Sequence, residues 1–217
     1  MSLSELWSLY GQNYIDALLA TWGMTLESFA IAMVLAVAVT VMRVSPLKPL
    51  RVFGDLYVQV FRNIPGIALL IIVVYALPPL KVVLPYRTCV IVATVLLGSA
   101  FGSENFMSGI NTVGVGQVEA ARSLGMSFSR ILAKIPQALR SSVLPMTNLF
   151  IAVMLTTALG SQVPLKPQEL TGVVSYINTR SLGGVAAFFI SALGYLGTAF
   201  VVSHIGNYID KKVRILR

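Results

Sequence analysis

Long apolar runs separated by short polar segments make up most of the sequence. A helix that crosses a bilayer needs about 20 predominantly apolar residues, and five stretches of the chain meet this requirement. The pattern predicts an all-α integral membrane protein with one domain, residues 1–217, because no second domain or internal repeat is visible. The five predicted spans are at about residues 18–42, 53–77, 88–107, 143–163 and 182–209.

The predicted second span begins with polar residues that are unusual at membrane depth. Asp55, Gln59, Arg62 and Asn63 precede a continuous apolar run, and Pro65 lies at the junction. Proline interrupts a helix, and irregular backbone at this depth is tolerated only where it is buried in protein or lines water. We therefore expect a local helix break at this junction, beside a solute pathway.

Arg62 and Glu104 are the charged candidates for this pathway. An arginine within a span is costly and usually faces a cavity or a partner, so Arg62 is a candidate for binding a carboxylate bidentately. The alternatives for Arg62 are an ion pair with Glu104 or Asp55, or a side chain that snorkels to the interface. Glu104, the only acid in the predicted third span, either binds a solute ammonium group or holds the helices together.

Three uncharged residues complete the set of pathway candidates. Asn63 lies at the expected helix break, and Thr157 and Gln162 lie in the predicted fourth span. Thr157 and Gln162 either contact the solute or form hydrogen bonds between helices, as such residues do in membrane proteins.

Composition supports a membrane protein and excludes several other classes. Hydrophobic residues make up 56% of the chain and charged residues 11%, against about 25% charged in soluble domains. This balance excludes a disordered chain and a coiled coil. One cysteine, Cys89, and one histidine, His204, leave no internal disulfide and little for a metal site or a catalytic triad, so we expect no metal and no catalytic residue.

Basic residues are distributed unevenly among the connecting segments. Eleven of the sixteen follow the first and third predicted spans or lie in the C-terminal tail, and four lie in the other connections. Cytoplasmic loops carry the excess of lysine and arginine. The split predicts an outside N-terminus, a cytoplasmic C-terminus and a cytoplasmic loop at about 108–142, and it explains the net charge of +8 without nucleic acid. The first twelve residues carry no basic side chain, so we expect no cleaved signal peptide.

The predicted cytoplasmic loop contains a sequence typical of a short, capped helix. Glu119 lies near the start of this helix, where its charge suits the helix dipole, and Gly125 is placed to end it in a left-handed conformation. Ala120 and Ala121 leave a small surface that lets a partner approach closely. The loop is therefore either a docking element for a soluble partner or an amphipathic connector on the membrane surface.

The same loop resembles a known family. Glu119, Ala120, Ala121 and Gly125 reproduce the EAA-xxx-G signature of permease subunits of bacterial binding-protein-dependent ABC importers, and residues 135–138 resemble its second half. The resemblance extends over about residues 12–212, nearly the whole chain.

Elements outside the loop resemble the polar amino-acid branch of these importers. They include an FR-x-x-P-like sequence at 61–65, Glu104 followed by Gly109-Ile110, and Glu169-Leu170 after the fourth span. Residues 42–46 and 108–113 look most like glutamate-type permeases.

A few positions depart from the family pattern. Met107 stands where the family usually has arginine, Leu155 stands where it usually has lysine, and the motif after Gly125 is shorter than usual. These departures indicate a heterodimer whose partner permease carries more of the solute contacts, a solute of different charge, or sequence drift at tolerant sites.

The resemblance implies a function, partners and a location. In this family two permease subunits, identical or merely similar, form the pathway, and two ATP-binding subunits beneath them each receive one EAA loop. An extracytoplasmic binding protein delivers the solute, and closure of the ATPases drives alternating access. The chain is then the permease subunit of a bacterial inner-membrane importer for a polar or acidic amino acid such as glutamate. It holds no cofactor of its own, since the partner subunits bind the ATP.

The sequence contains no GxxxxGK[ST] phosphate loop, so we expect a non-catalytic subunit. The alternative is a stand-alone secondary carrier or channel for a small polar solute. Such carriers often contain paired repeats of broken helices, and five spans without a visible repeat favour the permease. An intramembrane enzyme would have to use Glu104, Asp55 and His204, but no catalytic spacing links these residues.

Overall fold

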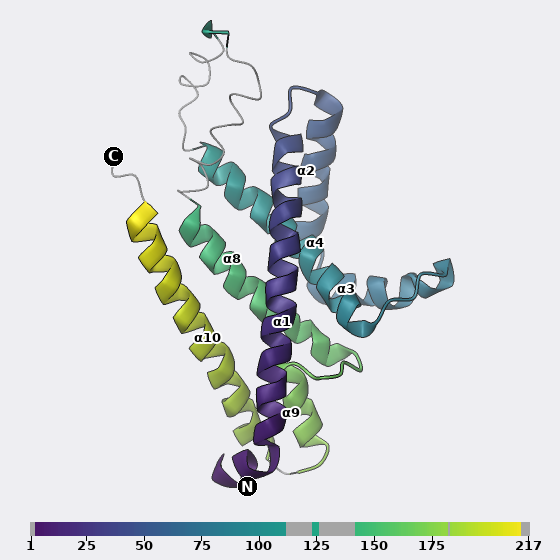
Figure 1. Cartoon of the computed structure of the whole chain (residues 1–217). Coiled ribbons are helices and arrows are strands. Elements are labelled where there is room, and N and C mark those ends of the chain that lie inside the picture. The colour runs from purple at the N-terminus through teal and green to yellow at the C-terminus, as the bar shows by residue number, and fades with distance from the viewer. Residues whose placement is uncertain (1–2, 112–122, 126–141, 182, 214–217) are drawn as a thin grey trace.

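The computed structural model describes residues 3–111, 123–125, 142–181 and 183–213, which form helices and turns without a strand (Figure 1). Among these residues, four helical segments are long and apolar enough to cross a membrane, and a bent pair makes five when it is counted as one span. The all-α fold with about five spans is therefore confirmed. The four segments are α1 (Leu3–Arg43), α4 (Tyr86–Asn111), α8 (Val143–Thr156) continued by the 3-10 helix η3 (Thr157–Gln162), and α10 (Gly184–Val213).

The bent pair replaces the predicted second span with an elbow. The pair is bent by 104°, and the break falls between Asn63 and Gly66, as the sequence predicts. Ile64 and Pro65 have extended backbone there, because proline disfavours helical backbone in the residue before it. The first arm is α2 (Lys48–Asn63), and the second contains α3 (Gly66–Ile71), the π-helix η1 (Ile72–Ala76) and the 3-10 helix η2 (Pro78–Leu80).

α1 begins well before the predicted first span. Its early residues Leu6, Tyr14 and Ala17 are buried in a cluster with side chains of α9 (Leu170–Asn178) and of the start of α10. The Tyr14 hydroxyl also donates a hydrogen bond to the Ala187 carbonyl oxygen at 3.1 Å. This packing extends the helix beyond the run that hydropathy marks, and the pattern of apolar residues did not predict α9.

The contact between α1 and α4 holds the centre of the bundle together. Gly98 and Gly102 of α4 face Ala32 and Ala36 of α1, and a methyl group on Gly102 would lie 2.8 Å from the Cβ of Ala36. Small residues at such positions let membrane helices approach closely. A hydrogen bond between the Thr40 and Ser103 hydroxyls, 3.1 Å long, adds a polar link at the same interface.

Glu169 is the N-cap residue of α9 and is fully buried. Its carboxylate accepts hydrogen bonds from the backbone N–H groups of Thr171 and Gly172, both at 2.6 Å, and from the Tyr195 hydroxyl at 3.0 Å. Burial raises the pKa of the Glu169 carboxyl, and these hydrogen bonds act in the opposite sense. Glu169 therefore caps α9 and ties it to α10, which gives a structural reason for the acid in the Glu169-Leu170 pair.

The two ends of the described chain lie at opposite ends of the bundle (Figure 1). The N-terminal end of α1 lies near α9, and the turn between α1 and α2 lies at the same end as the last turn of α10. Arg43, Lys48, Arg51, Lys211 and Lys212 belong to these turns. This arrangement matches an odd number of crossings, and the assignment of the basic end to the cytoplasm stays a prediction.

α10 presents large apolar side chains away from the bundle. Phe188, Leu196 and Phe200 are 61%, 65% and 69% exposed in the isolated chain. Apolar side chains on the outside of a membrane-spanning bundle contact lipid or another membrane subunit, so this exposure agrees with the composition of the sequence.

Candidate functional site

An open cavity of about 1000 Å³ lies where the elbow meets α4, α8 and η3. Small-molecule sites usually occupy about 300–1,000 Å³, so this space suits a small solute. Apolar side chains form most of its lining. The polar side chains that line it are Arg62, Thr94, Asn105, Asn148, Thr156 and Gln162.

Arg62 gives the cavity its charge, since it is the only ionisable side chain among the described lining residues. It lies in the last turn of α2, so the break that follows brings its side chain to the cavity. Its guanidinium lies over the ring of Phe101, 5.4 Å from the centroid, where the ring attracts a cation. The Arg62 side chain is 37% exposed and is thus accessible to a solute.

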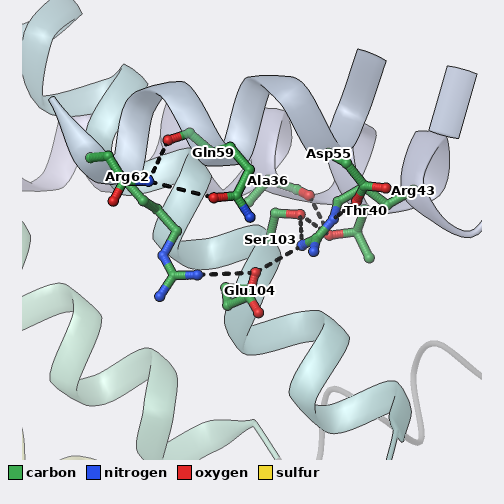
Figure 2. A network of polar contacts seen from close by, with 9 residues as sticks. Ala36, Thr40, Arg43, Asp55, Gln59, Arg62, Ser103 and Glu104 are labelled. Atoms are coloured by element: carbon green, nitrogen blue, oxygen red, sulfur yellow. Dashed lines mark hydrogen bonds and ion pairs between the residues drawn. The ribbon is translucent and has the colours of Figure 1, made fainter. Parts of the chain in front are cut away.

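Arg62 also belongs to a network of four charged residues, which Figure 2 shows from close by. Its Nη1 lies 3.3 Å from Oε2 of Glu104, and Nη1 of Arg43 lies 3.2 Å from the same oxygen. Nε of Arg43 lies 2.9 Å from Oδ1 of Asp55. The ion pair of Arg62 with Glu104 that the sequence allowed is therefore present, whereas Asp55 pairs with Arg43 and not with Arg62.

Sequence reasoning did not name Arg43 as a pathway candidate and counted it among the basic residues after the first span. The structure nearly buries it, with 12% of the side chain exposed, and Ser103 accepts a further hydrogen bond from it at 3.3 Å. Gly54 makes the room for this side chain, because a methyl group there would lie 2.8 Å from Cγ of Arg43. The only sequence signal for this place of Arg43 was the adjacent pair Gly54 and Asp55. The pair can be interpreted only when the packing of α1 against α2 is known.

Residues 28–215 match the protein family described as binding-protein-dependent transport system inner membrane component. The match spans every element that forms the cavity. The chain belongs to this family. It is therefore a multi-pass membrane protein and a non-catalytic permease subunit of a transport system.

Several relatives resemble this permease over most of their length. The glutamate transport system permease protein GluC of Corynebacterium efficiens is 33% identical, with 89% of this chain and 91% of GluC covered. The L-cystine transport system permease protein TcyB of Bacillus subtilis is 31% identical, with 95% and 91% covered. GlnM of Bacillus subtilis, named a probable glutamine ABC transporter permease protein, is 31% identical, with 97% and 96% covered.

Solved structures share the fold of the permease. A chain in the crystal structure of an amino acid ABC transporter with histidines superimposes with a TM-score of 0.88 at 24% identity, covering 98% of this chain and 99% of that chain. A chain of the inward-facing MetNI methionine ABC transporter superimposes with a TM-score of 0.73 at 19% identity, covering 99% and 100%. The chain thus shares its fold with chains of these ABC transporters.

The other predicted pathway residues of the permease take different places. Gln162 lines the cavity, and its side-chain amide donates to the Ser161 hydroxyl at 3.0 Å. Thr157 is fully buried and donates to the Met154 carbonyl oxygen at 2.6 Å, so it does not line the cavity. Asn63 turns back onto α2, where its amide donates to the Gln59 carbonyl oxygen at 2.6 Å, and it does not line the cavity either.

Sequence reasoning also missed polar residues that do line the cavity. Asn148 and Thr156 lie eight residues apart on α8, with Ala152 between them, so all three share one face of the helix. This spacing is readable in the sequence and was a usable signal. Asn105 donates a hydrogen bond to the Pro145 carbonyl oxygen at 3.2 Å and links α4 to α8 at the edge of the cavity.

The predicted coupling signature falls mostly outside the described residues. Glu119, Ala120 and Ala121 lie there, and only 123–125 of the loop's central part are described. Gly125 has a φ of 71°, which is the left-handed conformation predicted for it at the end of a helix. The coupling role of this signature stays a prediction.

Proposed function

We propose that this permease forms the solute pathway of an ATP-driven importer for an acidic or neutral polar amino acid. The observation that carries the proposal is the cavity of about 1000 Å³ with Arg62 as its charged lining residue. Relatives named for glutamate, cystine and glutamine support it, since each of these solutes carries an α-carboxylate.

The charges around the cavity favour a solute that presents a carboxylate. A guanidinium binds a carboxylate through two parallel hydrogen bonds, and Arg62 is accessible from the cavity. Glu104 already pairs with two arginines, so it offers little attraction to a cationic side chain. We therefore assign the cavity to glutamate, glutamine or cystine and not to lysine or arginine.

Two ATP-binding subunits are the proposed partners at the basic end of the molecule. The EAA-xxx-G signature at 119–125 supports this docking, because a short capped helix between two spans suits insertion into a groove on a soluble partner. A second permease subunit, either another copy or a similar chain, would complete the pathway beside the open cavity.

An extracytoplasmic binding protein is the proposed partner at the opposite end. A hollow of about 430 Å³ lies there between the early part of α1 and α9. Arg180 stacks over the ring of Tyr176, 3.9 Å from its centroid, and presents a cation at the rim. The polar residues that line the hollow are Asn13, Asp16, Lys166, Gln168, Tyr176 and Arg180.

Direct binding of amino acids to the purified complex of permease and ATPase tests the proposed solute class. The binding protein is left out, because it would impose its own selectivity. The probes are radiolabelled glutamate, glutamine and cystine, and the one that binds most tightly is then competed by its own α-carboxamide. We expect the carboxamide to compete about tenfold or more weakly, because hydrogen bonds between charged partners contribute about 1.5–3 kcal/mol.

Lysine serves as the control solute, since it has the same backbone and a cationic side chain. We expect it to compete poorly. Equal competition by the amino acid and its carboxamide, or tighter binding of lysine than of all three probes, would contradict the proposed role of Arg62 and the proposed solute class.

A further inference from the structure

One carboxylate oxygen in the charge network forms ion pairs with two arginines at once. Oε2 of Glu104 lies 3.2 Å from Nη1 of Arg43 and 3.3 Å from Nη1 of Arg62 (Figure 2). These three side chains come from α1, α2 and α4. The oxygen therefore joins the elbow, through Arg62, to the central helix pair.

The two arginines are held very differently. Arg43 is nearly buried, pairs with Asp55 at 2.9 Å, donates to Ser103 at 3.3 Å and lies in the space that Gly54 leaves. Arg62 is three times as exposed, at 37% against 12%, and lines the cavity. Its other described contact is the face of Phe101, which does not fix the direction of its hydrogen bonds. Arg62 is thus the partner that can leave Glu104.

A solute carboxylate is chemically equivalent to the Glu104 carboxylate as an acceptor for Arg62. Removing the partner of a desolvated charge is expensive when the charge is left unpaired. Here Glu104 stays paired with Arg43 after Arg62 turns away, and Arg62 gains the solute in its place. The exchange therefore leaves no charge in the network without a partner.

We propose that Glu104 is an internal competitor for the solute carboxylate: it occupies Arg62 in the empty permease, and the solute displaces it while Arg43 retains it. This inference rests on the proposed function and identifies a residue that sets affinity without touching the solute. Loading the permease also breaks the ion pair between α2 and α4 beside the 104° elbow, so the solute frees the elbow from the central helix.

The test compares two acids of the same network in the purified complex of permease and ATPase. The Glu104→Gln variant loses the competitor, so the dissociation constant for the tightest of glutamate, glutamine and cystine is expected to fall about two- to fivefold, the range for partly exposed ion pairs. Asp55→Asn is the matched control, because Asp55 also pairs with Arg43 and is partly exposed but does not contact Arg62. Its dissociation constant is expected to stay within about twofold of the unsubstituted protein.

A second variant keeps the test decisive if Glu104→Gln does not assemble with the ATPase. Glu104→Asp retains the charge on a side chain one methylene shorter, loses reach to Arg62, and is also expected to bind the solute more tightly. Unchanged or weaker binding in the assembled Glu104 variant, or an equal change in Asp55→Asn, would overturn the inference and leave the proposed function intact. Absence of binding of all three probes by the unsubstituted complex would overturn the proposed function and this inference with it.

Discussion

Replacing Arg62 with alanine is expected to reduce ATP-driven amino-acid uptake by about 10- to 150-fold, because hydrogen bonds between charged partners contribute about 1.5–3 kcal/mol. Arg62 is the only ionisable side chain among the described residues that line the cavity, so no neighbour there replaces its charge. Glu104 keeps its pair with Arg43 in the variant, so the fold is expected to persist. The measurement is the initial rate of radiolabelled uptake into proteoliposomes that contain the complete transporter and ATP.

Arg87→Ala is the matched control for this substitution. Arg87 is as accessible as Arg62, with 42% against 37% of the side chain exposed, and it also forms one ion pair, with Glu27 at 2.6 Å. It does not line the cavity. Exposed ion pairs contribute about 0–1 kcal/mol, so uptake is expected to change little in this variant. Near-normal uptake by Arg62→Ala, or the same loss in both variants, would reduce Arg62 to a structural residue.

Reversing the charge of Glu119 is expected to uncouple ATP hydrolysis from uptake. A lysine near the start of the predicted docking helix would oppose the helix dipole and reverse the charge that this helix offers to the proposed ATPase partner, and mismatched charges at an interface cost several kcal/mol. Glu119→Lys should therefore insert into the membrane normally, while uptake falls more than about tenfold. The measurement pairs the ATP hydrolysis rate with the uptake rate in the same proteoliposomes.

Glu5→Lys is a matched control, because it places the same change in the first turn of another helix, α1. Its uptake and ATP hydrolysis are expected to remain coupled. Coupled, wild-type uptake by Glu119→Lys would show that the EAA-xxx-G signature does not dock the ATPase.

The helices of this permease were largely predictable from the sequence, since bilayer thickness fixes the length of an apolar run. The break after Asn63 was predictable for a local reason, because Pro65 acts on the residue next to it. The early part of α1 and all of α9 were not predictable from the sequence. Their helices depend on contacts between residues far apart in the chain, such as the hydrogen bond from Tyr14 to Ala187.

The residues of the site likewise divide into those that the sequence predicted and those that it did not. Arg62 was found because an arginine inside a span needs a partner or a cavity wherever it lies. Thr157 was named as a candidate and the adjacent Thr156 was not, although Thr156 at the end of α8 lines the cavity and Thr157 at the start of η3 is buried. Arg43 was not among the pathway candidates, since its place in the charge network depends on how Gly54 of α2 packs against α1. Sequence patterns thus identified a charged residue that is costly to place within a membrane. They did not predict the helix packing that brings its partners together.

Thiol labelling of α8 tests most directly whether the cavity is the amino-acid pathway. Cys89 is the chain's one cysteine and is buried, so a Cys89→Ala background leaves a clean signal. In this background the variants Asn148→Cys, which lines the cavity, and Leu196→Cys, on the outer face of α10, are treated with a water-soluble methanethiosulfonate.

The account predicts that Asn148→Cys is labelled, that the transported amino acid slows this labelling several-fold, and that Leu196→Cys reacts slowly whether or not the amino acid is present. Labelling of Asn148→Cys that does not change with the amino acid, or no labelling there at all, would contradict the assignment of this cavity to the solute.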